Sequence, residues 1–289
     1  MTRVLLGILL AARAASGLAQ ETATPAAKAL PSDPPDTIQD NSFLVEEAYN
    51  QEPGVVQHIN FFQRNWRTGE WLASFTQEYP VPKIQHQLSY TIPLQRLDTS
   101  SGAATSLGDI ALNYRYQLVG DGEAKIAIAP RLTLLLPTGD QRRRLGSGST
   151  GIQVSVPVST VLTDDWIAHW NAGATFTPAA RDERGEKADA FGYNFGASLI
   201  WLGRSFNILV ETVWVRAQTV VGSGKTERAT GFLVSPGVRW AYNFSSGLQI
   251  VPGIGFPVGV GPSRGQRSIL LYLSFEHPFR RVQSSRPSG

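Results

Sequence analysis

Alternation between apolar and polar residues is the feature that most constrains this chain. In GIQVSVPVSTVL, residues 151–162, Ile152 and Val154 share one parity, and Gln153 and Ser155 share the other. Successive side chains of a β-strand point to opposite faces, so this segment predicts a strand with one apolar and one polar face. Such a strand fits a soluble sandwich and a membrane barrel equally well. The rest of the chain has to decide between them.

The alternating pattern recurs from Val55 to residue 278. We count about twelve such segments, many near the 9–11 residues that a tilted transmembrane strand needs. Their approximate spans are 55–63, 71–80, 86–96, 107–118, 125–137, 151–162, 166–177, 190–201, 205–218, 230–243, 248–258 and 267–278. The chain contains no apolar run of about 18 residues, which a spanning helix requires. If the protein enters a membrane, we expect it to do so with strands.

The connections between these segments alternate in length. The short ones are VPKIQ, VGDGEA, TDD, LGRS and SSG. The longer ones between them are RLDTSSGAATS, TGDQRRRLGSGST, PAARDERGEKADA, TVVGSGKTERA and GVGPSRGQR. Short turns at one rim, longer loops at the other and an even number of strands are typical of a bacterial outer-membrane barrel. The sequence therefore predicts an all-β fold, an antiparallel transmembrane barrel of about twelve strands with short periplasmic turns and longer extracellular loops.

The polar face of the predicted strands is charged, so it is unsuited to a soluble core. We expect these residues to line the lumen: His58, Glu78, Asp109, Asn113, Arg115, Arg131, His169, Asn171, Glu211, Arg239 and Glu276. Charges in a narrow barrel must either pair across the lumen or face water. Pairing would give a sealed barrel, and hydration would give a selective pore. Both alternatives stay open at the level of the sequence.

The chain divides into four regions. Residues 1–19 have a basic residue, a short apolar run and small residues before Ala19, which predicts a secretory signal peptide. Residues 20–54 are a Pro-rich leader in which Asp40 or Ser42 could cap a short helix that ends before Pro53-Gly54. The barrel is expected over residues 55–279, followed by a tail at 280–289. We hypothesise that the segment from Asp40 to Gly54 folds into the periplasmic mouth and gates it.

Composition and motifs exclude several other functions. The chain has no cysteine, and without the signal it carries 24 basic and 23 acidic residues, which makes nucleic acid a poor partner. GSGKT at 222–226 lacks the first glycine of a phosphate-binding loop, because residue 219 is threonine. We expect no cofactor and no metal. A lipid-modifying enzyme is the least favoured alternative: outer-membrane phospholipase uses a Ser/His pair at its lipid-facing surface, and no serine here has a recognisable nucleophile context.

Three segments resemble a known family of outer-membrane proteins. They are GDIALNYRY at 108–116, LPTGD (Leu136, Pro137, Thr138, Gly139 and Asp140) with the RRRLGSGSTG that follows, and DNSFLVEEAYNQEPGVVQHINFFQRNW. The chain is similar there to the transporter family labelled as the meta-pathway of phenol degradation. The resemblance covers most of the chain after about Asp40. It implies a porin-like barrel that passes small molecules, including aromatic or hydrophobic compounds, and it brings no catalytic residues.

The sequence thus predicts an outer-membrane channel for passive passage of small molecules through a polar, charge-lined lumen. The alternative is a structural or binding barrel whose lumen is sealed by ion pairs. Outer-membrane lipid and a small-molecule permeant are the expected partners. Arg142, Arg143 and Arg144 lie in a long outer loop, where we favour a solvated loop over contact with lipopolysaccharide phosphate.

Overall fold

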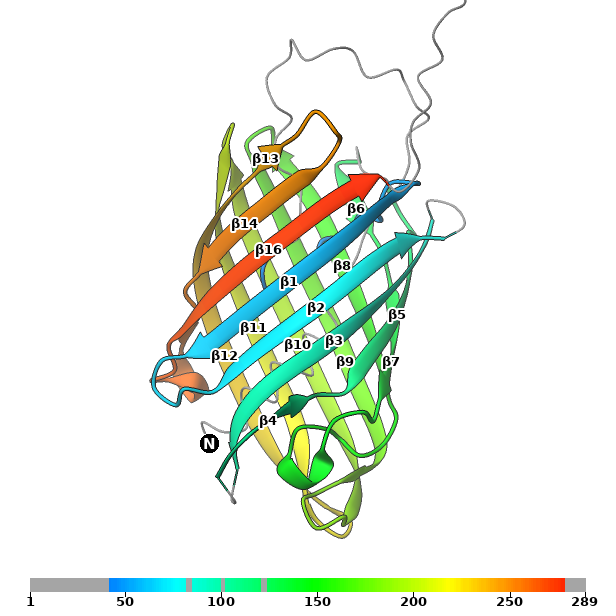
Figure 1. The fold of residues 1–289 in the computed structure, drawn as a ribbon, viewed down its shortest axis with the longest axis vertical. Coiled ribbons are helices and arrows are strands. Elements are labelled where there is room, and N and C mark those ends of the chain that lie inside the picture. The colour runs from blue at the N-terminus through cyan, green and yellow to red at the C-terminus, as the bar shows by residue number, and fades with distance from the viewer. Residues whose placement is uncertain (1–41, 82–84, 100–101, 121–123, 279–289) are drawn as a thin grey trace, which may run out of the picture.

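The protein is a closed antiparallel β-barrel of twelve spanning strands (Figure 1). The computed structural model describes residues 42–81, 85–99, 102–120 and 124–278. Neighbouring strands along the chain pair with one another, and β1 also pairs with β16 from Val55↔Pro278 to Asn65↔Ser268. Within the described residues, no helix is long and apolar enough to cross a membrane. The predicted fold class is confirmed.

The strands follow the predicted segments closely in the centre of the barrel. The elements are β1 (Val55–Asn65), β2 (Trp71–Pro80), β3 (His86–Thr99), β4 (Gly102–Leu107), β5 (Ile110–Tyr116), β6 (Ile126–Ile128), β7 (Arg131–Leu136), η1 (Gln141–Arg143), β8 (Gly151–Thr163), β9 (Trp166–Arg181), β10 (Lys187–Leu202), β11 (Phe206–Gly222), β12 (Lys225–Trp240), β13 (Tyr242–Asn243), β14 (Gln249–Gly255), β15 (Val258–Gly259), η2 (Gly261–Ser263) and β16 (Ser268–Pro278). Four pairs, β4/β5, β6/β7, β12/β13 and β14/β15, are each one spanning strand with a short break.

Prolines explain these four breaks. Pro93 of β3 lies opposite the break between β4 and β5, and the Gly108 amide donates to its carbonyl. Pro157, Pro236 and Pro252 lie in the same way opposite the breaks between β6 and β7, β14 and β15, and β12 and β13. A proline has no N–H to donate to its neighbour, so the ladder loses one bond at each of these positions. The prolines are thus accommodated by interrupting the partner strand locally.

The two ends of the barrel differ, as the loop lengths predicted. We call them the short-turn end, at the top of Figure 1, and the long-loop end, at the bottom. Both Val55 and Pro278 lie at the short-turn end. Three predicted long loops, however, are mostly strand: β3 and β4 pair up to Thr99↔Gly102, β9 and β10 pair from Arg181↔Lys187 onward, and β11 and β12 extend to Gly222↔Lys225. These extensions continue past the part of the outer wall that faces lipid, so neither of their faces has to be apolar. They therefore carry little apolar alternation, and the sequence pattern could not reveal them.

The two faces of the wall are sorted as the alternation predicted. On β5 the outward Leu112 and Tyr114 are 43% and 39% exposed, whereas the inward Asn113 and Arg115 are 3% and 0% exposed. On β8 the outward Ile152, Val154 and Val156 are likewise exposed, and Gln153, Ser155 and Ser159 are buried. The outer wall is apolar and the inner wall polar, which is the arrangement of a barrel surrounded by lipid.

The interior of the barrel holds residues 42–51, which we call the plug segment. These residues make bends and contain no helix, contrary to the predicted helical turn; the other candidate cap, Asp40, lies outside the described residues. A helix would satisfy its own peptide groups, but here side chains of the barrel wall satisfy them instead. The predicted signal peptide and C-terminal tail also lie outside the described residues.

Candidate functional site in the barrel lumen

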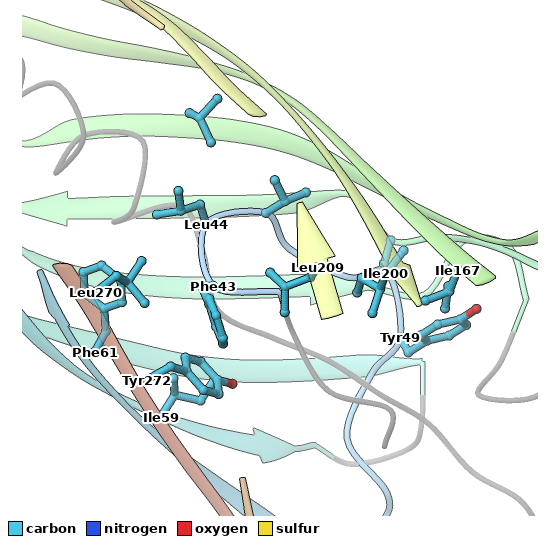
Figure 2. Packing of buried hydrophobic residues seen from close by; sticks show 14 of the residues in the cluster. Phe43, Leu44, Tyr49, Ile59, Phe61, Ile167, Ile200, Leu209, Leu270 and Tyr272 are labelled. Carbon is cyan, nitrogen blue, oxygen red and sulfur yellow. The ribbon is translucent and has the colours of Figure 1, made fainter. Parts of the chain in front are cut away.

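Apolar side chains of the plug segment form one small core with the barrel wall (Figure 2). Phe43, Leu44 and Val45 are almost fully buried, and the Phe43 ring lies 5.2 Å from that of Tyr272. Further along the segment, Tyr49 belongs to the same cluster. The wall contributes Ile59, Phe61, Ile167, Ile200, Leu209, Leu270 and Tyr272 to this core. Burial of these side chains favours the docked position of the segment.

Phe43 fits where the wall has no side chains. An added Cβ on Gly253 would lie 2.5 Å from two carbons of the Phe43 ring, and one on Gly237 would lie 2.6 Å from the ring. Real Cβ atoms do not approach that closely, so these positions require glycine while Phe43 is docked. The glycine-rich β14 therefore forms a recess for an aromatic ring of the plug segment.

Polar side chains of the wall bind the backbone of the plug segment. Glu211 Oε1 accepts from the amides of Leu44 and Val45 at 2.6 and 2.9 Å, and Asn171 Oδ1 accepts from that of Glu46 at 2.6 Å. The same kind of bond continues along the segment: Ser159 accepts from Ala48 N, Gln117 from Asn50 N and Gln87 from Gln51 N. The wall partners come from β3, β8, β9, β11 and the turn after β5, all in the half of the barrel near the short-turn end. The segment therefore spans the lumen as a layer.

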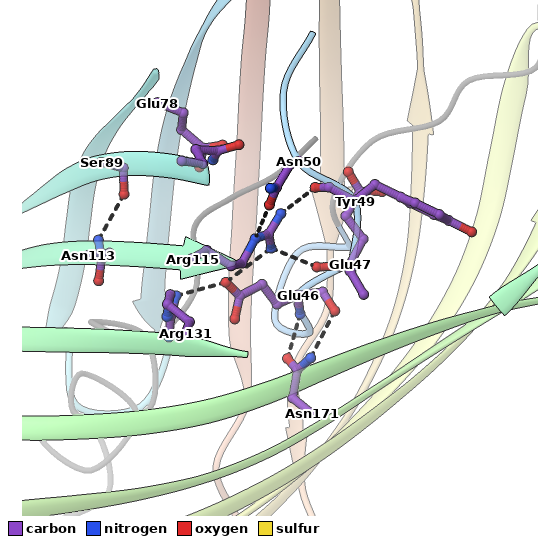
Figure 3. A network of polar contacts seen from close by, with 12 residues as sticks. Glu46, Glu47, Tyr49, Asn50, Glu78, Ser89, Asn113, Arg115, Arg131 and Asn171 are labelled. Carbon is purple, nitrogen blue, oxygen red and sulfur yellow. Dashed lines mark hydrogen bonds and ion pairs between the residues drawn. The ribbon is translucent and has the colours of Figure 1, made fainter. Parts of the chain in front are cut away.

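One carboxylate of the plug segment forms ion pairs with two arginines of the wall (Figure 3). Glu46 Oε1 lies 2.8 Å from Arg131 Nη1 and 3.6 Å from Arg115 Nη1, and all three side chains are buried. Arg115 also donates to the carbonyls of Glu47 and Tyr49 and to Asn50 Oδ1. Arg115 therefore binds the plug segment through both its charge and its hydrogen-bond donors, which suits the fixed fork of a guanidinium.

A cavity of about 460 Å³ occupies the other half of the lumen, toward the long-loop end. We call it the vestibule. Its walls mix apolar residues such as Leu72, Leu97 and Leu135 with polar ones such as Gln95 and Thr175. Charged residues, including Arg144 and Arg181, line its outer part. Among the described residues none that lines the vestibule belongs to the plug segment, so the lumen consists of a filled half and a hollow half.

Asp109 positions the loop that carries the LPTGD motif. Its carboxylate accepts from Gly139 N at 3.0 Å and from the amide and hydroxyl of Ser147 at 2.7 and 2.6 Å. Thr138 Oγ1 donates to Gly108 O and accepts from Ile110 N. A Cβ at position 139 would overlap the carbonyl of Leu145, so the loop can fold back on itself only with glycine there. The residues after the motif then form part of the vestibule wall.

The structure brings most of the predicted lumen residues together around the plug segment. Those that contact it directly are Arg115, Arg131, Asn171, Glu211 and Glu276. Glu78 accepts from Gln87, which in turn binds the plug backbone, and Asn113 bonds to Ser89 and Thr133. Arg239 and His169 are also buried inside the barrel. Asp109 lies apart from this group, at the motif loop.

His58 does not point into the lumen, so this prediction was wrong. On β1 the inward residues include Ile59 and Phe61, which are apolar because they pack against the plug segment. On the other strands the more polar set of alternate residues faces inward, but on β1 it faces outward. His58 therefore lies on the outer wall beside Phe275.

A serine and a histidine meet inside the barrel, which the sequence analysis did not anticipate. Ser159 and His169 are direct partners across the β8–β9 hairpin, and Ser159 Oγ lies 2.7 Å from His169 Nδ1. Both are almost fully buried under the plug segment, and Ser159 Oγ also accepts from Ala48 N. The pair faces the lumen, whereas a phospholipase pair faces lipid. The short TDD turn between β8 and β9 sets the register of the hairpin, and this register could have predicted that Ser159 and His169 lie opposite each other.

The fold and its polar, partly filled lumen define an outer-membrane β-barrel of the porin-like class. More particularly, the chain belongs to the family described as the putative MetA-pathway of phenol degradation, whose model matches residues 33–275.

The chain is similar to solved structures at low sequence identity. An outer membrane channel from Pseudomonas putida F1 is 14% identical, with a TM-score of 0.57 over 83% of this chain and 99% of that one. The NanC porin is 10% identical, with a TM-score of 0.49 over 75% and 98% of the two chains. None of the curated proteins compared with the chain matches it in sequence.

Proposed function

We propose that this protein is a passive channel for small molecules in the outer membrane, held closed by the plug segment. The observation that carries the proposal is the divided lumen: a hollow vestibule at the long-loop end and a separable layer near the short-turn end. The plug segment is held to wall side chains by hydrogen bonds and ion pairs, which water can replace when the segment moves, and by apolar contacts, whose burial favours the docked position. A barrel built only as a scaffold could fill its lumen with side chains of its own strands.

The vestibule supports a permeant that is partly apolar. Leucine, valine and alanine side chains alternate there with threonine and glutamine, so an aromatic ring with a polar substituent would find partners for both parts. This agrees with what the family resemblance implies for the class of permeant. Displacement of the plug segment would then join the vestibule to the short-turn end through a lumen lined by Arg115, Arg131, Glu211 and Arg239.

One observation favours the alternative of a permanently sealed barrel. Glu46 forms ion pairs with both Arg115 and Arg131 in the buried layer, and this is the ion-paired lumen that a barrel without a conduit would have. Neither alternative uses catalysis, and the buried Ser159–His169 pair has no lipid-facing approach. In the motif loop, Arg143 and Arg144 pair with Asp140 and Glu183, which favours a solvated loop over contact with lipopolysaccharide.

The proposed closed channel rests on export by residues 1–19 and on insertion with the short turns in the periplasm. Its test is single-channel recording on the mature protein and on a variant in which residues 42–51 are replaced by a glycine-serine linker of equal length. The native protein should conduct in brief, rare steps, and the variant should conduct continuously. In the linker background, Arg131→Glu should shift selectivity toward cations, while Arg142→Glu in the outer loop should leave it nearly unchanged. A silent linker variant that is folded and inserted would establish the sealed barrel.

A further inference from the structure

Two histidines meet on the outer wall where the first and last strands pair. His58 of β1 and His277 of β16 point outward near the short-turn end, and their Nε2 atoms lie 3.1 Å apart. Their rings are stacked, with centroids 5.2 Å apart and an interplanar angle of 18°. Both side chains are half-buried and therefore accessible from outside.

Neighbouring side chains hold the two rings in this arrangement. The His58 ring stacks on Phe275 at 4.7 Å and on Phe75 at 6.0 Å. His58 Nδ1 lies 3.3 Å from the side-chain amide of Gln77, and His277 Nδ1 lies 3.4 Å from the carbonyl oxygen of Pro278. A pair of ligands held by such outer contacts is pre-organised, because little rotamer freedom is lost when something binds.

The hydrogen-bond partners allow both Nε2 lone pairs to be available at once. Pro278 O can accept a proton from Nδ1 of His277. The Gln77 amide contacts His58 with one end and Tyr90 Oη with the other, at 2.5 Å. If its oxygen and nitrogen exchange places, it accepts from His58 Nδ1–H and donates to Tyr90 Oη, because a hydroxyl can both donate and accept. Each ring then carries its proton on Nδ1, as metal-bound imidazoles commonly do.

We propose that His58 and His277 form a binding site for a divalent transition-metal ion that prefers imidazole, such as Cu²⁺ or Zn²⁺. At a metal–nitrogen distance of about 2.05 Å, two Nε2 atoms 3.1 Å apart subtend an angle of about 98° at the ion. This lies between the angles of square-planar and tetrahedral coordination, which these ions adopt. Water would complete the shell, because the described residues gather no group of three His, Cys, Asp or Glu side chains.

Such an ion would join β1 to β16 at the seam of the barrel. The site lies on the outside of the wall, three residues after β1 begins, and so it is distinct from the lumen and independent of the proposed channel function. The competing explanation is a hydrogen bond between the two imidazoles with no affinity for metal. The two explanations differ in the number of nitrogen atoms bound to an added ion.

The test uses the mature protein without a polyhistidine tag, titrated with Cu²⁺ and followed by calorimetry and electron paramagnetic resonance. We expect one ion per chain, with hyperfine splitting from two nitrogens and displacement by excess Zn²⁺. His58→Gln and His277→Gln should each weaken binding at least tenfold (about 1.4 kcal/mol). In each variant the hyperfine splitting should show at most one nitrogen bound to Cu²⁺.

The matched control is His86→Gln, which removes a histidine that contacts Tyr114 on the same outer wall. It should bind Cu²⁺ as the native protein does. Binding as strong in either single variant as in the native protein, or a two-nitrogen signal that persists in the double variant His58→Gln with His277→Gln, would overturn the proposal. Circular dichroism of each variant shows whether the barrel has folded.

Discussion

Removal of the charge on Glu46 provides a quantitative test of the plug segment as a closure. Glu46 is the carboxylate that lies 2.8 Å from Arg131 and 3.6 Å from Arg115, with all three side chains buried. In Glu46→Gln the two guanidinium groups stay in the docked layer without their nearest counterion, although the more distant Glu78 still acts on both. When the segment leaves, water enters and solvates them. The substitution therefore raises the free energy of the docked state more than that of the displaced state.

The size of this effect follows from the burial of the pair. Loss of one partner of a buried ion pair destabilises by about 3–5 kcal/mol. The lower figure corresponds to a shift of roughly 150-fold in the equilibrium between docked and displaced plug, with RT of about 0.59 kcal/mol. The open probability in single-channel recordings should rise by about this factor until it saturates. Glu52→Gln is the matched control, because Glu52 is exposed just beyond the plug segment.

The double variant Glu46→Gln with Arg131→Gln separates charge from packing. Removal of one arginine together with the carboxylate restores part of the electrostatic balance, so we expect the open probability to fall back toward the native value. An open probability of Glu46→Gln equal to that of the native protein, in folded and inserted barrels, would refute the reasoning that this ion pair keeps the channel closed.

The remaining predictions concern other parts of the barrel. Gly253→Ala should also raise the open probability, because its Cβ would lie 2.5 Å from the docked Phe43 ring, and adding Phe43→Ala should remove the clash while leaving the plug weakly held. Asp109→Asn should speed tryptic cleavage at 142–144, because it weakens the three hydrogen bonds that hold the motif loop. Each hydrogen bond to a charged group contributes about 1.5–3 kcal/mol. Unchanged digestion would contradict the anchoring role of Asp109. Val156→Arg on the lipid face should lower the unfolding free energy in vesicles by about 2–4 kcal/mol in denaturant titrations.

Much of the wall could be predicted because its chemistry repeats. On β5 and β8 lipid requires an apolar side chain at every second position, so the alternation revealed both the strands and their orientation. The same reasoning failed on β1, where Ile59 and Phe61 face inward. Their partners are residues of the plug segment, and no local pattern in β1 reports a contact with another part of the chain.

The plug segment itself could be predicted only in part. The hypothesis that residues before the first strand enter the barrel agrees with the position of residues 42–51, but the expected helical turn is absent from them. Their conformation is set by Glu211, Asn171 and other wall side chains that are distant in sequence. Sequence reasoning identified several of these wall residues as inward and polar. It could not identify their partner, because the pairing depends on the three-dimensional closure of the sheet.

The position of the plug segment in the chain constrains how the barrel can assemble. The segment precedes β1, yet its partners lie on strands as distant as β11, β14 and β16, and the β1–β16 pairing joins Val55 to Pro278. Contacts between residues so far apart in sequence form late in folding. The chain loses conformational entropy when its distant parts meet, before the new contacts contribute their favourable free energy. During folding, the segment can complete these contacts only after β11, β14 and β16 have joined the wall. The first described residues of the chain are therefore among the last to complete their contacts.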